Sequence, residues 1–263
     1  MYREKVTQQS THLERPMNVL VYGTSGYPVI VFPTQDATCT NYEDFGMVET
    51  LADYLEAGSI QLFCVDSVDK ESWSDSDLPK ERRAATQEAY YNYVCDELVP
   101  FVHERNGSTY RPLLTGCSMG ATHSVIYVLR RPDLFQGCIA LSGVYSADCF
   151  FGGWMNDTLY LNSPTHFLPN MPADHPYVRR YNHRQIVLCV GRGAWEEDGI
   201  WTQQAVEESF RRLGVGAWCD YWGYDVNHDW PWWKKQIRYF LPITLRNIER
   251  RVAGEAAEGG SRS

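Results

Sequence analysis

The chain has 263 residues and a formal net charge of −9, with 44% apolar and 22% charged residues. This length and composition are typical of one large globular α/β domain, and the acidic balance argues against a nucleic-acid partner, which needs clustered Lys and Arg. No run approaches the ~18 apolar residues of a membrane span, and the amino-terminal segment lacks the apolar core of a signal peptide. We therefore expect a cytoplasmic protein with no membrane partner.

Short apolar runs alternate with helical patterns along the chain. The expected strands are 17–22, 28–33, 60–66, 111–115, 137–142, 185–191 and 216–222. The expected helices are 81–105, 119–130, 201–213 and 231–250. Continuous rather than alternating apolar runs indicate strands buried on both faces, so we predict a mostly parallel sheet with helices on both sides.

One region interrupts this alternation. Residues 144–184 are rich in Tyr, Phe, Trp, Asn, Pro and His and show no clean period, which favours a lid-like insertion between two strands. The last stretch, 251–263, is small and polar and is expected to be a disordered tail. We therefore predict a single domain over residues 1–250.

The eight cysteines form no C-x-x-C pair, so neither a zinc ribbon nor a thioredoxin-type motif is expected. Cys64, Cys138 and Cys189 lie inside apolar runs, which is typical of reduced, buried thiols.

The segment Gly116-Cys117-Ser118-Met119-Gly120 has the pattern G-x-S-x-G. It follows an expected strand and precedes an expected helix, the context of a nucleophile elbow in an α/β-hydrolase sheet. Glycines are needed there because side chains on either side of the serine would collide in so tight a turn. Ser118 is therefore a candidate nucleophile, and the alternative is an inert serine in a glycine-flanked turn. Cys117 precedes the apex of the turn, so a packed thiol is expected.

A serine hydroxyl needs a general base, and in this fold the base follows the last strand. Among the seven histidines, His228 alone lies between the last expected strand and the last expected helix. His123 lies on the helix after Ser118 and should point elsewhere, and His103 is expected at the surface. His228 is therefore the candidate base. The insertion histidines could contact substrate: His166, His175 and His183.

The acid that orients the base should follow the strand at 185–191, where three carboxylates stand in a row. Spacing alone does not choose among them. Glu196 is favoured because it lies three residues past a glycine turn, and Glu197 and Asp198 remain open alternatives.

An oxyanion hole is expected from two backbone N–H groups. One is that of Met119, the residue after the nucleophile, at the positive end of a helix. The other is assigned to Gln35 in the loop after the strand at 28–33, with Thr34 and Asp36 as neighbouring alternatives.

With these residues in place, the chain resembles the Putative esterase family of α/β hydrolases, which includes esterase D (S-formylglutathione hydrolase) and the antigen 85 mycolyltransferases. The resemblance covers most of residues 17–243. It rests on "LLTGCSMGATHSVIYVLRRPDLFQGCIALSG", like the family's elbow, helix and next strand, and on "NHDWPWWKKQIRYFLP", like its H-D-W-x-x-W ending. It implies an α/β-hydrolase fold and acyl transfer from esters, usually to water, with no cofactor and no metal. By the same resemblance Ser118 is the nucleophile, His228 the base and Glu196 the acid.

The sequence thus predicts a serine carboxylesterase that hydrolyses a small or medium ester through an acyl-enzyme. An acyltransferase with the same triad and a hydrolase-fold binding protein without catalysis are the alternatives. The expected partner is a small-molecule ester, and homo-oligomer formation is left open.

Overall fold

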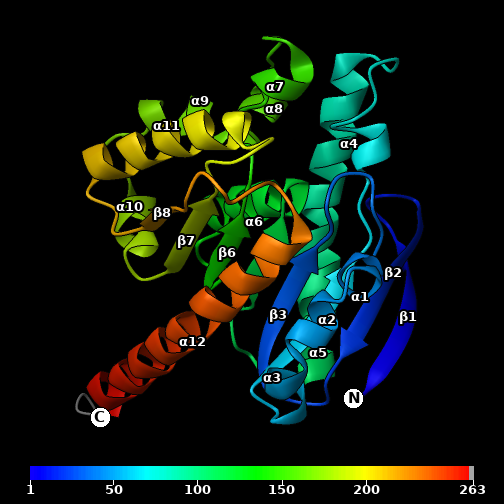
Figure 1. Cartoon of the computed structure of the whole chain (residues 1–263), viewed down its shortest axis with the longest axis vertical. Helices are drawn as coiled ribbons and strands as arrows, with labels where there is room; N and C mark the ends of the chain where they lie inside the picture. Colours follow the sequence, from blue (N-terminus) through cyan, green and yellow to red (C-terminus); the bar gives the residue numbers. More distant parts are fainter. Residues whose placement is uncertain (261–263) are drawn as a thin grey trace.

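The computed structural model describes residues 1–260, with side chains through residue 251, and its centre is one eight-stranded sheet (Figure 1). The strand order is β1-β2-β4-β3-β5-β6-β7-β8. The pairs β1–β2 and β2–β4 are antiparallel and all other neighbouring pairs are parallel. This mixed, mostly parallel sheet confirms the predicted fold class. The strands are β1 (Arg3–Ser10), β2 (Arg15–Tyr22), β3 (Tyr27–Phe32), β4 (Ile60–Val65), β5 (Leu113–Cys117), β6 (Gly137–Leu141), β7 (Gln185–Val190) and β8 (Trp218–Tyr221).

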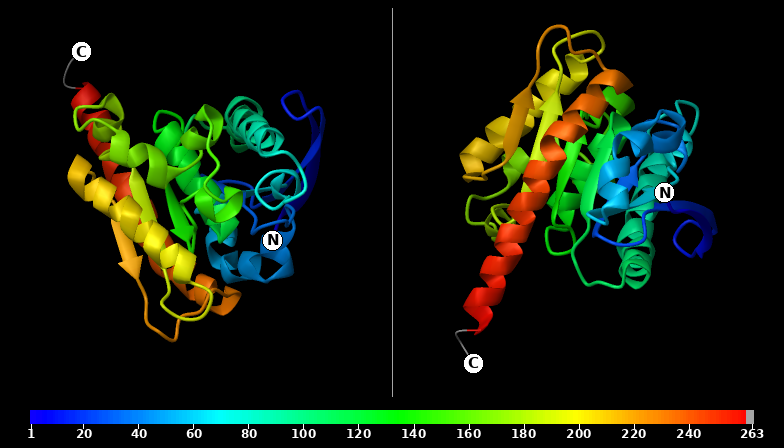
Figure 2. Two further views of the ribbon diagram at one scale, coloured as in Figure 1. Left: turned by 90° about the horizontal axis from the view of Figure 1, so that it is seen from above. Right: turned by 60° about the horizontal axis from the view of Figure 1, so that its bottom comes forward.

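Helices cover both faces of the sheet, and each face has its own apolar core. One core holds residues of α4 (Lys80–Tyr93), α5 (Val99–Asn106), α6 (Met119–Arg130) and α11 (Glu197–Leu213). The other holds residues of α1 (Asn41–Asp44), α2 (Met47–Thr50), α3 (Ala52–Glu56) and α12 (Trp230–Gly260), and α12 crosses this face diagonally (Figure 2). Strands such as β4 are buried along their whole length because both faces are covered, which explains the continuous apolar runs.

The strand β1 and the helix expected at 81–105 are among the elements that differ from the sequence prediction. β1 was not predicted, because its sequence REKVTQQS is polar and its residues alternate between exposed and half-buried positions. It is an antiparallel edge strand, where one face meets solvent and an apolar run is not required. The helix predicted at 81–105 is divided into α4 and α5 by a π-helical turn at Val94–Leu98.

The insertion predicted at 144–184 is helical. It contains α7 (Asp148–Phe151), α8 (Asp157–Leu161), α9 (Pro164–Asn170) and α10 (Pro176–Tyr181), between β6 and β7. α9 contacts α6 and α11, and α8 contacts α4, so the insertion packs on the same face as those helices. In Figure 1, α7 and α8 lie at the top of the view, beyond the sheet.

The structure extends α12 to Gly260, past the boundary predicted at residue 250. The Ala and Glu residues at 253–258 are strong helix formers, which gives a physical reason for the extension. The remainder of the expected disordered tail, 261–263, lies outside the described residues, and the single-domain boundary stays a prediction.

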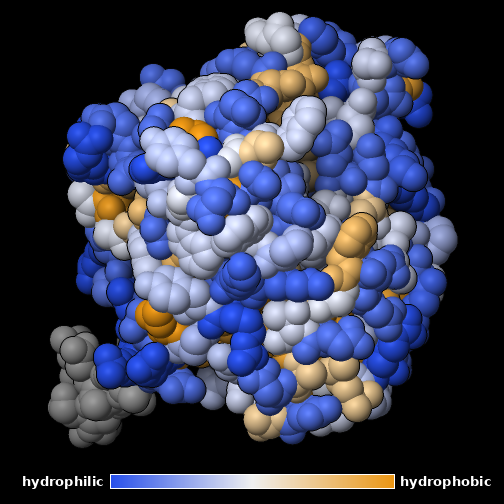
Figure 3. Space-filling model, viewed as in Figure 1, coloured by the Kyte–Doolittle hydropathy of each residue, from blue (hydrophilic) through white to orange (hydrophobic). Residues whose placement is uncertain are grey.

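The molecular surface in the view of Figure 3 is mostly hydrophilic, with apolar residues scattered in small groups. Within the described part of the chain, none of the helices has the length and apolar character needed to cross a bilayer.

Candidate active site

Ser118 lies at a sharp turn between the end of β5 and the start of α6. Its backbone has φ 56° and ψ −122°, a region that non-glycine residues rarely adopt. The turn is held on both sides: the Ser118 N–H donates to the Leu141 carbonyl at 2.8 Å, and the Ser118 carbonyl accepts from the Ala121 N–H at 3.0 Å. The side chain is half-buried, so its hydroxyl lies at an accessible apex.

The two glycines that flank the serine are required by close backbone contacts. A Cβ on Gly116 would lie 2.5 Å from the Gly120 carbonyl carbon. A Cβ on Gly120 would clash with the Phe32 carbonyl and lie 2.7 Å from the Pro33 carbonyl oxygen. The first contact closes the turn, and the second brings the start of α6 against the end of β3. The loop that follows β3 is thereby placed beside Ser118.

His228 and Glu196 form a hydrogen-bonded pair. Glu196 follows β7 at the start of α11 and is fully buried, and His228 lies in the loop between β8 and α12 with its side chain 22% exposed. The His228 Nδ1–H donates to Glu196 Oε2 across 3.0 Å. This bond fixes the ring so that Nε2 is the nitrogen free to accept a proton.

The two alternative acids lie elsewhere. Glu197 and Asp198 are exposed in the first turn of α11. The Asp198 carboxylate accepts a hydrogen bond from the Trp201 indole N–H at 3.1 Å. Of the three adjacent carboxylates, the structure brings Glu196 to the histidine.

Two further side chains, Ser142 and Trp233, hold the Glu196 carboxylate in place, and the sequence did not assign a role to either. The Ser142 hydroxyl donates to Glu196 Oε1 at 2.6 Å, and the Gly191 N–H donates to the same oxygen at 3.3 Å. The Trp233 indole N–H donates to the Ser142 hydroxyl at 2.9 Å. The edge of the same indole meets the His228 ring, with centroids 4.9 Å apart and planes at 83°. The buried carboxylate therefore has donors on both oxygens, which offsets its loss of water.

A local signal existed for one of these two residues. Trp233 is the second Trp of the H-D-W-x-x-W segment. Ser142 directly follows β6, as Ser118 follows β5, but it has no flanking pattern of its own. Its φ of 56° becomes visible only in the structure.

The sheet explains why these residues lie along the same edge. β5, β6, β7 and β8 are parallel neighbours, so the residues after their carboxyl ends lie along one edge. Ser118 is bonded to Leu141, the residue before Ser142, and Ser142 is bonded to Glu196. Hydrogen bonds, together with the peptide bond between Leu141 and Ser142, thus connect the turn at Ser118 to Glu196 and on to His228.

The expected oxyanion donors have free N–H groups. Neither the Met119 nor the Gln35 N–H has a hydrogen-bond acceptor among the residues that the structure describes. The Thr34 N–H, one neighbouring alternative, is already donated to Asn41 Oδ1 at 3.0 Å. The Gln35 side chain is bound through Nε2 to the Ser74 hydroxyl at 2.8 Å, and that hydroxyl donates to the Asp36 carboxylate at 2.6 Å. The loop after β3 is therefore fixed by side-chain contacts.

The other candidates considered in the sequence have structural partners. His123 is fully buried and its Nε2 lies 2.9 Å from Asp69 Oδ1. His103 Nε2 lies 3.1 Å from the Tyr110 carbonyl. The Cys117 thiol is buried, 3.8 Å from the Tyr42 hydroxyl, and burial raises its pKa. Over the described residues, the structure has no cluster of three or more His, Cys, Asp or Glu that could hold a metal ion.

The mostly parallel sheet, with a strand–serine–helix turn at its carboxyl edge, defines an α/β hydrolase. Within this class the chain belongs to the Putative esterase family, whose sequence model matches residues 10–242. The resemblance found in the sequence is thereby confirmed. The catalytic roles of the individual residues stay predictions.

Several solved structures are similar to the whole chain. An S-formylglutathione hydrolase from Agrobacterium tumefaciens has a TM-score of 0.71 at 16% identity, covering 93% of this chain and 95% of its own. A ferulic acid esterase from Anaeromyces mucronatus has a TM-score of 0.69 at 16% identity, covering 94% and 92%. MPT51 from Mycobacterium tuberculosis has a TM-score of 0.70 at 13% identity, covering 94% and 99%. At these identities the likeness establishes the fold. No curated protein matches the chain by sequence.

Proposed function

We propose that the protein is a serine carboxylesterase that hydrolyses a small or medium carboxylic ester through an acyl-enzyme. Ser118 is the nucleophile, His228 the general base and Glu196 the acid that orients the base. The N–H groups of Met119 and Gln35 stabilise the oxyanion. These roles are more specific than what family membership implies, and the proposal is based on the geometry at the carboxyl edge of the sheet.

The reaction proceeds in two acyl-transfer steps. The Ser118 Oγ attacks the ester carbonyl carbon while its proton moves to His228 Nε2, and the carbonyl oxygen becomes an oxyanion. The resulting imidazolium is stabilised by the Glu196 carboxylate and gives its proton to the departing alkoxide. Water then attacks the acyl-enzyme, again losing a proton to Nε2, and the carboxylic acid leaves with Ser118 Oγ reprotonated.

The observation that carries this proposal is the backbone of Ser118. A serine at φ 56° costs of order 1–3 kcal/mol, and such strain persists where the surrounding structure holds it for a function. The hydrogen bond between His228 and the buried Glu196, at the same edge of the sheet, supports His228 as a base with an oriented ring. Two of the similar structures are named as an S-formylglutathione hydrolase and a ferulic acid esterase, which supports the same reaction class.

Labelling with a fluorophosphonate tests the nucleophile. We expect the wild-type protein and a Cys117→Ala variant to be labelled, and a Ser118→Ala variant to remain unlabelled. The cysteine variant is the matched control because it changes the neighbouring residue of the same turn. An unlabelled wild-type protein would favour a hydrolase-fold binding protein.

Turnover of p-nitrophenyl esters, from acetate to octanoate, tests the reaction and its acyl length. Hydrolysis that is lost in Ser118→Ala supports the esterase. If the acyl group is instead transferred to an added alcohol faster than to water, the acyltransferase alternative holds. No turnover of any ester by a folded wild-type protein would refute the proposed activity.

A further inference from the structure

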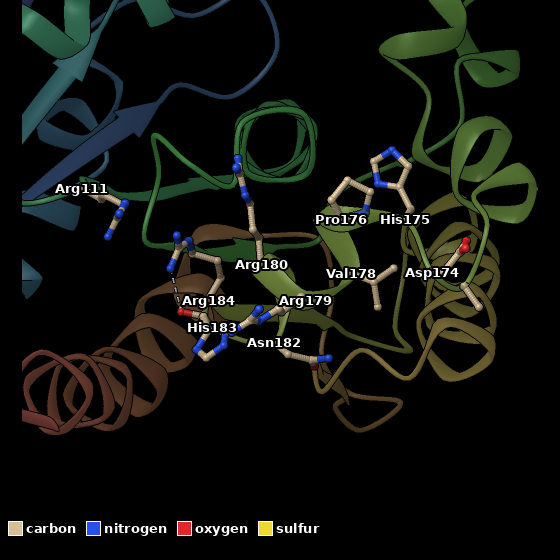
Figure 4. Close-up of a pocket in the computed structure, with 11 residues that line it drawn as sticks. Arg111, Asp174, His175, Pro176, Val178, Arg179, Arg180, Asn182, His183 and Arg184 are labelled. Atoms are coloured by element: carbon tan, nitrogen blue, oxygen red, sulfur yellow. Dashed lines mark hydrogen bonds between the residues drawn. The ribbon is translucent and has the colours of Figure 1, made fainter. Parts of the chain in front are cut away.

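A second site lies at the opposite edge of the sheet. A groove of about 870 Å³ opens beside α10, the segment that leads into β7, and Arg111, two residues before β5 (Figure 4). Its polar and charged lining residues are Arg111, Asp174, His175, Arg179, Arg180, Asn182, His183 and Arg184. Apart from the insertion histidines, the sequence prediction assigned nothing to this region.

The groove is separate from the candidate active site. Arg111 precedes the amino end of β5, whereas Ser118 follows its carboxyl end. A five-residue strand at about 3.3 Å per residue places these two ends roughly 17 Å apart. A ligand in the groove would therefore not contact the proposed catalytic residues.

The charge of this groove is opposite to that of the chain. The whole protein has a formal net charge of −9, yet the groove is lined, among the described side chains, by four arginines and one carboxylate, that of Asp174. In Figure 4, Asp174 lies beside His175 at the end of the groove farthest from Arg111. Clustered like charges repel unless an anion lies between them, so the arrangement favours a negatively charged ligand.

A nearby carboxylate outside the lining, Asp133, neutralises only part of this charge. Its carboxylate is bound by the Arg131 guanidinium at 2.9 Å. Arg180 approaches the same carboxylate at 4.0 Å, the limit of an ion pair. Asp133 is thus shared between two arginines.

Several donors in the groove remain available. Arg179 has neither a hydrogen bond nor an ion pair with any residue in the described part of the chain. Arg111 uses Nε alone, which donates to the Asp133 carbonyl at 2.8 Å, so its terminal amino groups have no acceptor within the described residues. Arg184 is buried and donates to the carbonyls of Pro132 and His183, which fixes its guanidinium in the wall of the groove.

The basic surface continues beyond this groove. An adjoining hollow of about 420 Å³ shares Arg184 and adds Arg250 and Arg251 from α12, and its lining contains no carboxylate among the side chains described, which end at residue 251. The guanidinium group presents paired donors that match phosphate and carboxylate oxygens, and all of the fixed positive charges here are arginines. A groove of this volume, with several guanidinium groups, is larger than a single oxyanion needs.

We propose that the groove lined by Arg111, Arg179, Arg180 and Arg184 binds a small polyanion that carries several phosphate or carboxylate groups. Arg179 and Arg180 on α10 and Arg111 before β5 supply the exchangeable contacts, and Arg184 supplies a fixed one. This binding site does not depend on the proposed esterase activity.

Calorimetric titration of the full chain with tripolyphosphate and with citrate tests the proposal. The test variant is Arg179→Glu/Arg180→Glu. The matched control, Arg82→Glu/Arg211→Glu, makes the same change in net charge at exposed positions on α4 and α11. We expect at least one probe to bind the wild type, with a Kd raised at least tenfold in the test variant and changed less than twofold in the control. Binding of tripolyphosphate alone identifies a phosphate ligand, and binding of citrate alone identifies a polycarboxylate.

The proposal is overturned if neither probe binds the wild type, or if the control variant weakens binding as much as the test variant. A second variant, Arg111→Gln, removes a single charge at an exposed position and should also raise the Kd. This variant tests the proposal if Arg179→Glu/Arg180→Glu does not fold. Hydrolysis of p-nitrophenyl acetate should be unchanged in Arg179→Glu/Arg180→Glu. A failure to detect anion binding in the groove would therefore leave the esterase proposal unaffected. An absence of esterase activity would likewise leave the proposed anion site unaffected.

Discussion

Replacing Glu196 by Gln keeps the size of the side chain and removes its charge, and the structure indicates how the amide would be oriented. Glu196 Oε1 accepts from the Gly191 N–H and the Ser142 hydroxyl, whereas Oε2 accepts from His228 Nδ1. A backbone N–H can only donate, so the amide oxygen must take the Oε1 position. The NH₂ group then faces His228.

This orientation selects the wrong tautomer of the base. With an NH₂ donor beside it, Nδ1 must act as the acceptor, so the proton of the neutral ring moves to Nε2. A protonated Nε2 cannot take the proton of Ser118. The imidazolium also loses its carboxylate partner. Loss of the correct tautomer and of this partner together lowers kcat by up to about 10⁴-fold, equivalent to about 5 kcal/mol in the activation barrier.

The assay is the kcat for p-nitrophenyl acetate, with the thermal midpoint Tm as a check on folding. We expect kcat to fall by about 10³- to 10⁴-fold in Glu196→Gln while KM changes little. Glu197→Gln and Asp198→Asn, the neighbouring exposed carboxylates, serve as matched controls and should keep near-full activity. If Glu196→Gln keeps near-full activity and one of the controls loses about 10²-fold, the acid is misassigned.

Three more predictions concern Ser142 beside Glu196, Gly120 in the turn at Ser118, and the accessibility of two cysteines. Ser142→Ala removes one hydroxyl donor from the triad acid and should lower kcat about tenfold, measured with the same ester. Gly120→Ala places a Cβ against the Phe32 carbonyl and should lower the free energy of unfolding by about 3 kcal/mol, measured in urea. Iodoacetamide should label the exposed Cys149 before the buried Cys117, as read by peptide mass spectrometry. Partial desolvation and the nearby carboxylates of Asp198 and Asp148 raise the pKa of Cys149 to about 11, so its labelling rate should increase about tenfold per pH unit between about pH 7 and 9.

A specific result would contradict each of these three predictions. Unchanged kcat in Ser142→Ala would mean that the hydroxyl does not support the acid. A Gly120→Ala protein as stable as the wild type would mean that α6 can shift away from β3. Labelling of Cys117 at the rate of Cys149 would show that the thiol beside the nucleophile is accessible.

The sequence predicted the strands that contain an apolar run and missed β1, which contains none. β3 and β4 appear as unbroken apolar runs because helices cover each side of the sheet. β1 is held by its pairing with β2, and its alternating polar residues carry too little apolar character to predict a strand. Edge pairing is a non-local property, so a local hydrophobic pattern does not report it.

The turn at Ser118 was predictable because its steric demands leave a local pattern in the sequence. Gly116 and Gly120 contact residues that follow the serine directly or lie on a neighbouring strand, and the steric demand leaves a fixed spacing in the sequence. The acid has no such local signature. Glu196 is distinguished from its two neighbours by a hydrogen bond to Ser142, 54 residues earlier, and by one to His228, 32 residues later.

The position of His228 relative to Glu196, the proposed base and acid, depends on a contact between two loops. The Gly193 N–H donates to the Val226 carbonyl at 2.8 Å, the Ala194 N–H to Asn227 Oδ1 at 2.9 Å, and the His228 N–H to the Ala194 carbonyl at 3.0 Å. A Cβ on Gly193 would lie 2.6 Å from the Val226 carbonyl oxygen, so a larger residue would separate the loops. Because these bonds join the acid loop to the base loop without any contribution from substrate, the ring is oriented before an ester binds, and little reorganisation is needed when charge develops on it. The glycine at position 193 is thus as necessary to this arrangement as the glycines of the nucleophile turn, although it lies in no recognised motif.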